Sequence, residues 1–179
     1  KNNLINHFGL TTDDCGGIYA AGTSYTGKVI EGNIILNAWG NTNGLPASVP
    51  AAEGIYIDEP STGNYVVRNV IANGRASGIK YHNSYSMTCR GNVLYNNAVG
   101  ILVYKSQSNG AYMRNISFKE NVIVAKDASQ ITLKIYSLVA DDPLLFGSSD
   151  SNYYCRPVSE GNTIQTRNVN TVIDYSLTS

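Results

Sequence analysis

Charged residues, sulfur-containing residues and long apolar runs are all scarce in this chain of 179 residues. Charged side chains make up 15% of it, against roughly 25% in an average globular domain. Lysine plus arginine and aspartate plus glutamate each number 13, so no net charge attracts nucleic acid or a membrane surface, and neither is expected as a partner. No apolar run reaches about 18 residues, which argues against a membrane-spanning helix.

Familiar catalytic and metal-binding motifs are missing too. The sequence has no CxxC pair, HExxH, P-loop, GxSxG or GGxGxD calcium repeat. Its three cysteines, Cys15, Cys89 and Cys155, allow either one disulfide and a free thiol or three buried free thiols, and we favour the second. The first residues show no basic and apolar signal peptide, as expected of a mature secreted chain or an excised fragment.

Asparagine, glycine and tyrosine are abundant instead. They number 21, 17 and 13, a composition that disfavours helices and favours turns and strands. Hydrophobic residues make up 42%, enough for a core, and the length is that of one ordinary domain.

Two short patterns recur along the chain. The first is a glycine, then an isoleucine, then an alternating strand, at residues 15–20, 52–57, 77–82 and 99–104, with a degenerate copy at 130–135. The second, Asn-x-aliphatic, follows each of the first four, at residues 33–37, 69–73, 92–96 and 121–125, with a weak earlier copy at 2–6. The shortest repeat is 22 residues, from Gly78 to Gly100. Two strands per unit with no helical period indicate a solenoid of parallel strands.

Stacking of the units predicts ladders of equivalent side chains about 4.8 Å apart. One inward aliphatic ladder contains Ile18, Ile55, Ile79, Ile101 and Ile131, and a second contains Ile35, Ile71, Leu94 and Ile123. An asparagine ladder at a turn contains Asn33, Asn69, Asn92 and Asn121.

These Gly-Ile strands and Asn turns resemble the right-handed parallel β-helix repeat family, the pectate-lyase-like superfold. The resemblance implies an all-β, single-stranded right-handed parallel β-helix of about five coils over residues 1–137. Residues 138–179 lose the repeat and are expected to form an irregular C-terminal coil or cap. Without a visible N-terminal cap, we expect the chain to be a fragment of a longer one. The superfold hosts polysaccharide lyases, glycoside hydrolases, epimerases, esterases, tailspikes and adhesins, so it does not fix the function.

Strand alternation places two rows of side chains on the outer surface. The first row is Tyr19, Tyr56, Lys80, Leu102 and Thr132, and the second is Ala21, Asp58, His82, Tyr104 and Lys134. Asp58 and His82 fall in adjacent coils, within hydrogen-bonding reach, and such an aspartate orients a histidine.

A catalytic site is therefore predicted around His82. We assign His82 as base or proton shuttle, Asp58 as its orienting partner, Lys80 as charge neutraliser and Tyr104 as acid or sugar contact. Expected substrate contacts are Tyr19, Tyr56, Glu59, Trp39 and Lys105; Trp39 belongs, with Tyr25, to a long insertion that we expect to form a groove wall. The alternative is that these residues are simply solvated.

The sequence assigns no definite cofactor. Calcium is conceivable at Asp13, Asp14 and Glu53, whose oxygens suit a hard cation, although an ordinary turn explains the aspartate pair better.

The function predicted from the sequence is a carbohydrate-active protein, a polysaccharide lyase or glycoside hydrolase that holds an extended glycan in a groove on the outer strand face. The alternative is a non-catalytic carbohydrate-binding or structural module of a surface protein, adhesin or tailspike. The expected partner is a polysaccharide or oligosaccharide, and the expected location is secreted or at the cell surface.

Overall fold

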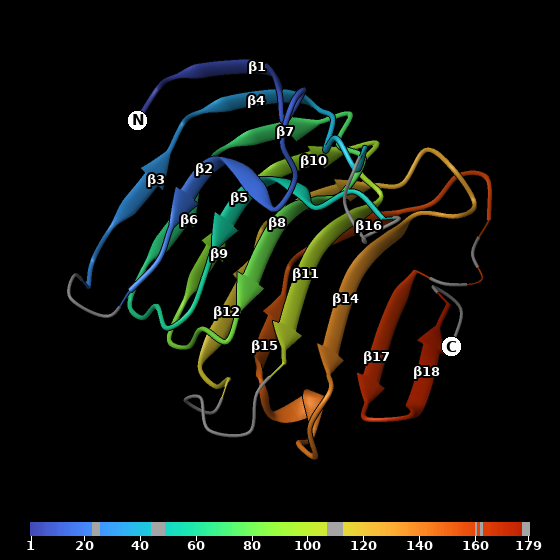
Figure 1. Cartoon of the computed structure of the whole chain (residues 1–179). Helices are drawn as coiled ribbons and strands as arrows, with labels where there is room; N and C mark the ends of the chain where they lie inside the picture. The colour runs from blue at the N-terminus through green and yellow to red at the C-terminus, as the bar shows by residue number, and fades with distance from the viewer. Residues whose placement is uncertain (23–25, 44–48, 107–112, 160, 162, 177–179) are drawn as a thin grey trace.

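The computed structural model describes residues 1–22, 26–43, 49–106, 113–159, 161 and 163–176. The chain passes through three sheets in turn, and each coil lies beside the one before it (Figure 1). Neighbouring strands in every sheet run parallel, except for one antiparallel pair at the C-terminal end. The structure is the all-β parallel solenoid that the repeats predict.

The three sheets are named here by their strands in chain order. Sheet A contains β1 (Leu4–Phe8), β4 (Ile34–Ala38), β7 (Val70–Ala72), β10 (Val93–Tyr95), β13 (Val122–Val124) and β16 (Tyr153–Cys155). Sheet B contains β2 (Cys15–Ala20), β5 (Ala52–Ile57), β8 (Ser77–His82), β11 (Val99–Lys105), β14 (Ile131–Ser137), β17 (Ile164–Asn168) and β18 (Thr171–Tyr175). Sheet C contains β3 (Val29–Glu31), β6 (Tyr65–Val67), β9 (Thr88–Arg90), β12 (Ile116–Lys119) and β15 (Gly147–Asp150).

Aliphatic ladders fill the space between the sheets. Ile55, Ile79 and Ile101 pair in register and are fully buried, as predicted. The next rung is Leu133, which pairs with Ile101, whereas Ile131 pairs with Val99. The predicted rung at Ile131 is therefore wrong by two residues.

The glycine of the Gly-Ile pattern allows sheets A and B to pack closely. A Cβ atom at Gly54 would lie 2.5 Å from the Gly78 carbonyl oxygen and 2.5 Å from Ile71 Cγ2. Real Cβ atoms do not approach other atoms so closely, so only glycine fits there. The recurring glycine thus lets the aliphatic ladder of sheet A contact the backbone of sheet B.

The predicted asparagine ladder is present and is longer than expected. From Asn33 onward, each side-chain oxygen accepts from the backbone and side-chain N–H groups of the asparagine one coil earlier. Its members are Asn3, Asn33, Asn69, Asn92, Asn121 and Asn152. A second, more exposed ladder joins Asn6, Asn37, Asn73, Asn96 and Gln130.

We expect Asn92→Ala to lower the free energy of unfolding by about 1–3 kcal/mol. Asn92 is fully buried, and its amide donates to the Val66 carbonyl (2.9 Å) and to Asn121 Oδ1 (2.9 Å). Removing it leaves buried groups without partners. Chemical denaturation measures the effect, with Asn6→Ala as a matched control, since Asn6 is an exposed member of the second ladder. Equal midpoints for the two variants would show that the buried ladder adds no stability.

The coils continue beyond residue 137, where the sequence predicts an irregular segment. β15, β16 and β17 extend the three sheets in parallel, and a 3₁₀ turn, η1 (Pro143–Leu145), lies between β14 and β15. β18 then pairs antiparallel with β17, because a turn at residues 169–170 reverses the chain (Figure 1). β18 thus closes a hairpin within the segment that the sequence predicts to be irregular.

All three cysteines are free, as expected, but only Cys89 is buried; Cys15 and Cys155 are partly exposed, so the expectation of three buried thiols is wrong for these two. Among the described residues, no helix has the length and apolar character needed to cross a bilayer.

Candidate functional site

Two rows of side chains cover the outer face of sheet B, as the parallel register requires. The first row is Tyr19, Tyr56, Lys80, Leu102 and Lys134, and the second is Asp58, His82, Tyr104 and Tyr136. The two-residue shift in β14 corrects the prediction for that strand. Lys134 belongs to the first row, Tyr136 takes its place in the second, and Thr132 is buried with its hydroxyl donating to the Thr163 carbonyl.

Asp58 accepts three hydrogen bonds at the end of β5. The donors are the Tyr19 hydroxyl (2.6 Å), the Glu59 amide (2.8 Å) and His82 Nδ1 (2.7 Å). Burial favours the neutral acid, but these donors outweigh it and hold the pKa of Asp58 below its ordinary value. The bond to Asp58 also raises the pKa of Tyr19 to about 12. At neutral pH the site therefore contains an aspartate anion and a neutral tyrosine.

Acid should weaken the fold by protonating Asp58. Because its folded-state pKa lies below the ordinary value of 3.8, the ionised form stabilises the fold above that pH, and this contribution is lost as the pH falls through the lower pKa. We expect the free energy of unfolding to decline as the pH falls below about 3.8, and Asp58→Asn to flatten that decline. Urea denaturation across this range measures both, and an equally steep decline in the variant would contradict the assignment.

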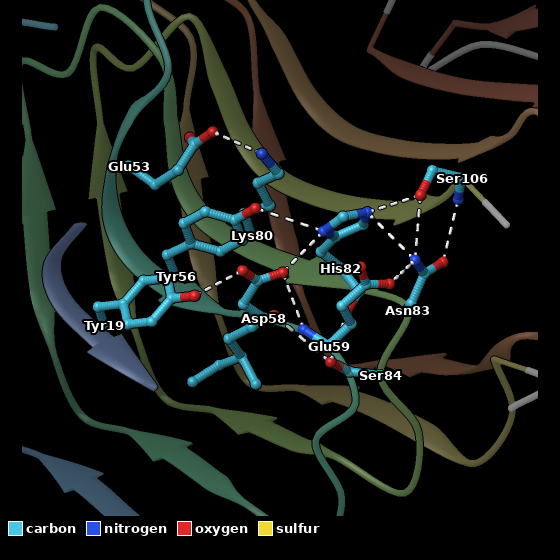
Figure 2. A network of polar contacts seen from close by, with 11 residues as sticks. Tyr19, Glu53, Tyr56, Asp58, Glu59, Lys80, His82, Asn83, Ser84 and Ser106 are labelled. Carbon is cyan, nitrogen blue, oxygen red and sulfur yellow. Dashed lines mark hydrogen bonds and ion pairs between the residues drawn. The ribbon is translucent and has the colours of Figure 1, made fainter. Parts of the chain in front are cut away.

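His82 lies between Asp58 and Ser106, a residue that the sequence analysis did not predict at the site. Its Nε2 is 2.8 Å from Ser106 Oγ, just past β11 (Figure 2). Asn83 holds the serine in place: the Ser106 amide donates to Asn83 Oδ1 (3.0 Å), and Asn83 Nδ2 donates to Ser106 Oγ (3.0 Å). Asn83 Nδ2 also donates to the Glu59 carboxylate. Asp58, His82 and Ser106 therefore form a continuous hydrogen-bonded line across three neighbouring coils.

Lys80 is paired with a buried carboxylate. Its Nζ lies 3.3 Å from Glu53 Oε1, while the Ser77 amide donates to Glu53 Oε2 (2.6 Å). Burial raises the pKa of Glu53 despite these partners. Lys80 Nζ also lies 4.3 Å from the centre of the Tyr56 ring. The cation is thus fixed on the sheet face beside His82 (Figure 2).

A stack of rings continues from His82 to a groove. The His82 and Tyr104 ring centres are 5.1 Å apart at 19°, and the Tyr104 and Tyr136 centres are 5.3 Å apart at 17°. The groove has a volume of about 310 Å³, and its lining includes Arg75, Lys80, Leu102, Tyr104, Lys134 and Tyr136. His82 does not line it, but the Tyr104 ring connects the two.

Two of the predicted sugar contacts are buried, and their assignment is corrected. Tyr56 is only 4% exposed, because Lys80 and the edge of the Tyr19 ring cover it. Lys105 is 3% exposed, and its Nζ lies 2.8 Å from Asp141 Oδ2. Neither side chain can present itself to a glycan.

The other predicted contacts lie in different settings. Tyr19 is 52% exposed on the sheet B face. Glu59 follows Asp58 directly and accepts from Asn83. Trp39 is exposed, but it follows β4 of sheet A, and its ring lies 4.5 Å from the Arg75 guanidinium rather than in the groove lining. Tyr25, from the same insertion, lies outside the described residues.

The residues considered for calcium do not gather in one place. Across the described parts of the chain, no three His, Cys, Asp or Glu side chains lie close enough to hold a metal. Asp13 Oδ1 accepts from the Ala51 amide (2.7 Å), and Glu53 faces Lys80.

The sequence pattern contained a signal for Ser106, although a weak one. Ser106 stands two residues after Tyr104, so strand alternation directs its side chain to the same surface. Asn83 has φ of 44°, a left-handed conformation that asparagine tolerates. That turn places its amide beside Ser106.

Comparison with protein-family models gives a match to the right-handed β-helix region over residues 1–134. Comparison with curated proteins and with solved structures gives no significant match. The family match covers most of the chain and agrees with the three parallel sheets. The chain belongs to the right-handed β-helix family.

Proposed function

We propose that the outer face of sheet B binds an extended acidic polysaccharide and that His82 transfers a proton in a reaction on it. The observation that carries this proposal is the cationic, ring-lined groove next to the His82–Asp58 pair. Since such a glycan is met outside the cell, a secreted or cell-surface location forms part of the proposal.

The charges around the groove favour an anionic ligand. Arg75, Lys80 and Lys134 line it, together with the Glu53 carboxylate that pairs with Lys80, so the cations outnumber the anion. The Arg167 guanidinium lies 4.6 Å from the Tyr136 ring centre. Burial, together with the charge of Arg167, lowers the pKa of Lys134. A uronate carboxylate bound between these cations would relieve their repulsion, while the Tyr104 and Tyr136 rings offer surfaces for sugar rings.

The reaction centre provides acid–base groups at one end of the groove. Asp58 orients His82, as in enzymes where a histidine accepts a proton. Lys80 supplies a fixed positive charge, and burial raises the pKa of Tyr104 so that its hydroxyl stays protonated. These are the groups that β-elimination next to a uronate carboxylate requires.

Hydrolysis by two carboxyl groups has less support. That mechanism needs one protonated and one ionised carboxyl group on opposite sides of the bond. Asp58 is held ionised by its three donors, and Glu53, whose pKa is raised, is 3% exposed against Lys80. A non-catalytic binding module remains the alternative; it predicts the same ligand but no dependence of any reaction on His82.

We expect the protein to bind a polyuronate such as polygalacturonate, and Lys134→Gln to weaken that binding about tenfold. One charge-assisted hydrogen bond is worth about 1.5–3 kcal/mol, and 1.4 kcal/mol is a factor of ten. Isothermal titration calorimetry at two salt concentrations measures the effect, with neutral dextran as the ligand control. Lys119→Gln, on β12 of sheet C, is the matched control variant. Equal affinity for dextran and polyuronate would contradict an acidic ligand.

A further inference from the structure

We propose that Ser106 is a nucleophile and that this site hydrolyses an ester carried by the bound glycan. Ser106 Oγ lies 2.8 Å from His82 Nε2, and His82 Nδ1 lies 2.7 Å from Asp58 Oδ1. A hydroxyl becomes nucleophilic when a histidine removes its proton and a carboxylate orients that histidine. The inference extends the proposed function by naming the reaction at the same site.

The hydrogen bonds set the direction of proton transfer for a neutral imidazole. The Asp58 carboxylate accepts, so the short contact places the His82 hydrogen on Nδ1, and Nε2 is then the acceptor. Because the Ser106 amide donates to Asn83 Oδ1, the Asn83 NH₂ group faces Ser106 Oγ and donates to it. The Ser106 hydroxyl hydrogen is then directed to His82 Nε2. Every member of the line therefore has the donor or acceptor role that nucleophilic catalysis needs.

The reaction balances with water as the second reactant. Ser106 Oγ attacks the ester carbonyl carbon while His82 Nε2 takes the hydroxyl proton. The carbon–oxygen bond to the sugar then breaks, and His82 returns the proton to the departing sugar oxygen. Water, activated by His82, hydrolyses the acyl-serine to release the acid and restore Ser106.

Asn83 provides a donor near the reacting atoms. Its Nδ2 is 3.0 Å from Ser106 Oγ and 3.2 Å from His82 Nε2. Its two amide hydrogens are donated to Ser106 Oγ and to the Glu59 carboxylate. Asn83 therefore fixes the position of the nucleophilic oxygen beside His82.

The charge of the groove indicates which kind of ester the site would bind. Arg75, Lys80 and Lys134 favour sugar units with free carboxylates, which a methyl ester would neutralise. An acyl group on a hydroxyl leaves the carboxylate charged. The expected substrate is thus an O-acylated, for example O-acetylated, acidic polysaccharide.

A fluorophosphonate probe, which labels activated serines covalently, tests the nucleophile directly. Intact-mass spectrometry of the labelled protein should show one adduct, mapped to Ser106 by peptide analysis. Ser106→Ala should abolish it, and His82→Ala should slow its formation by about 10²–10⁴. Ser148→Ala, an exposed serine on β15, should label like the unaltered protein. Absence of an adduct on Ser106, or an equal labelling rate in His82→Ala, overturns the proposal.

Acetate release from an O-acetylated polyuronate tests the substrate class. Release should be lost in Ser106→Ala while polyuronate affinity, measured by calorimetry, is retained. If the unaltered protein binds polyuronate and forms unsaturated uronate without releasing acetate, the ester-hydrolysis proposal is wrong, while the proposed proton transfer by His82 is supported. If Ser106 reacts with the probe but no polyuronate binds, Ser106 is a nucleophile, but the proposal of an acidic glycan ligand is wrong.

Discussion

Replacement of His82 by alanine should lower turnover of the glycan substrate by about 10²–10⁴, the usual contribution of a positioned acid or base. His82 is the group that touches both Asp58 and Ser106, so both elimination and ester hydrolysis lose their proton acceptor. Its side chain is 15% exposed, and no cavity forms in the aliphatic core. We therefore expect the variant to fold and to retain affinity for polyuronate.

The control for this variant is the chain's other histidine. His7 lies on β1 of sheet A at a positive φ of 54°, so His7→Asn preserves the conformation and should leave turnover unchanged. Added imidazole should restore part of the activity of His82→Ala, which a purely structural role would not allow. Full turnover in His82→Ala, on a substrate that the unaltered protein converts, would show that His82 is not the proton acceptor of the reaction.

The sequence could predict the coils because each one repeats the same packing requirement. Gly54 is needed where sheet A touches the backbone of sheet B, and Ile55 fills the interior beside it. The last register is harder to predict, because strand alternation has a period of two residues and a shift by two preserves every face. Ile131 and Leu133 both satisfy the pattern, and no glycine precedes Ile131 to decide between them.

The close approach of Asp58 and His82 was predictable, because adjacent coils place equivalent outward positions side by side. The contacts that bury a side chain were not predictable from the local pattern. Lys105 follows the outward Tyr104 and so shares the inward face of Ile101 and Val103, where it is buried against Asp141, which stands 36 residues later in the chain. Tyr56 points outward but lies beneath Lys80. Ser106 was not predicted because its partner, His82, lies in the adjacent coil but pairs in register with Tyr104, two residues before Ser106. The prediction considered only contacts between residues that pair in register.

The largest expected effect on stability is that of Ile79→Ala, at about 2–5 kcal/mol. Ile79 is fully buried and pairs with Ile55 on one side and Ile101 on the other. Truncation removes apolar contacts and leaves a cavity that three rigid sheets cannot close by collapsing. Ile79→Val, which removes one methylene group, should cost only about 0.5–1.5 kcal/mol.

Chemical denaturation followed by circular dichroism distinguishes these outcomes. Val93→Ala is the matched control, because Val93 is 40% exposed on β10 of sheet A and a surface change of this kind stays within about 0.5 kcal/mol. Each coil contacts only its neighbours, so a weakened central coil can separate the unfolding of the two ends. We therefore expect Ile79→Ala to lower the midpoint and to broaden the transition. An unchanged midpoint would mean that the aliphatic ladder at β8 does not hold the coils together.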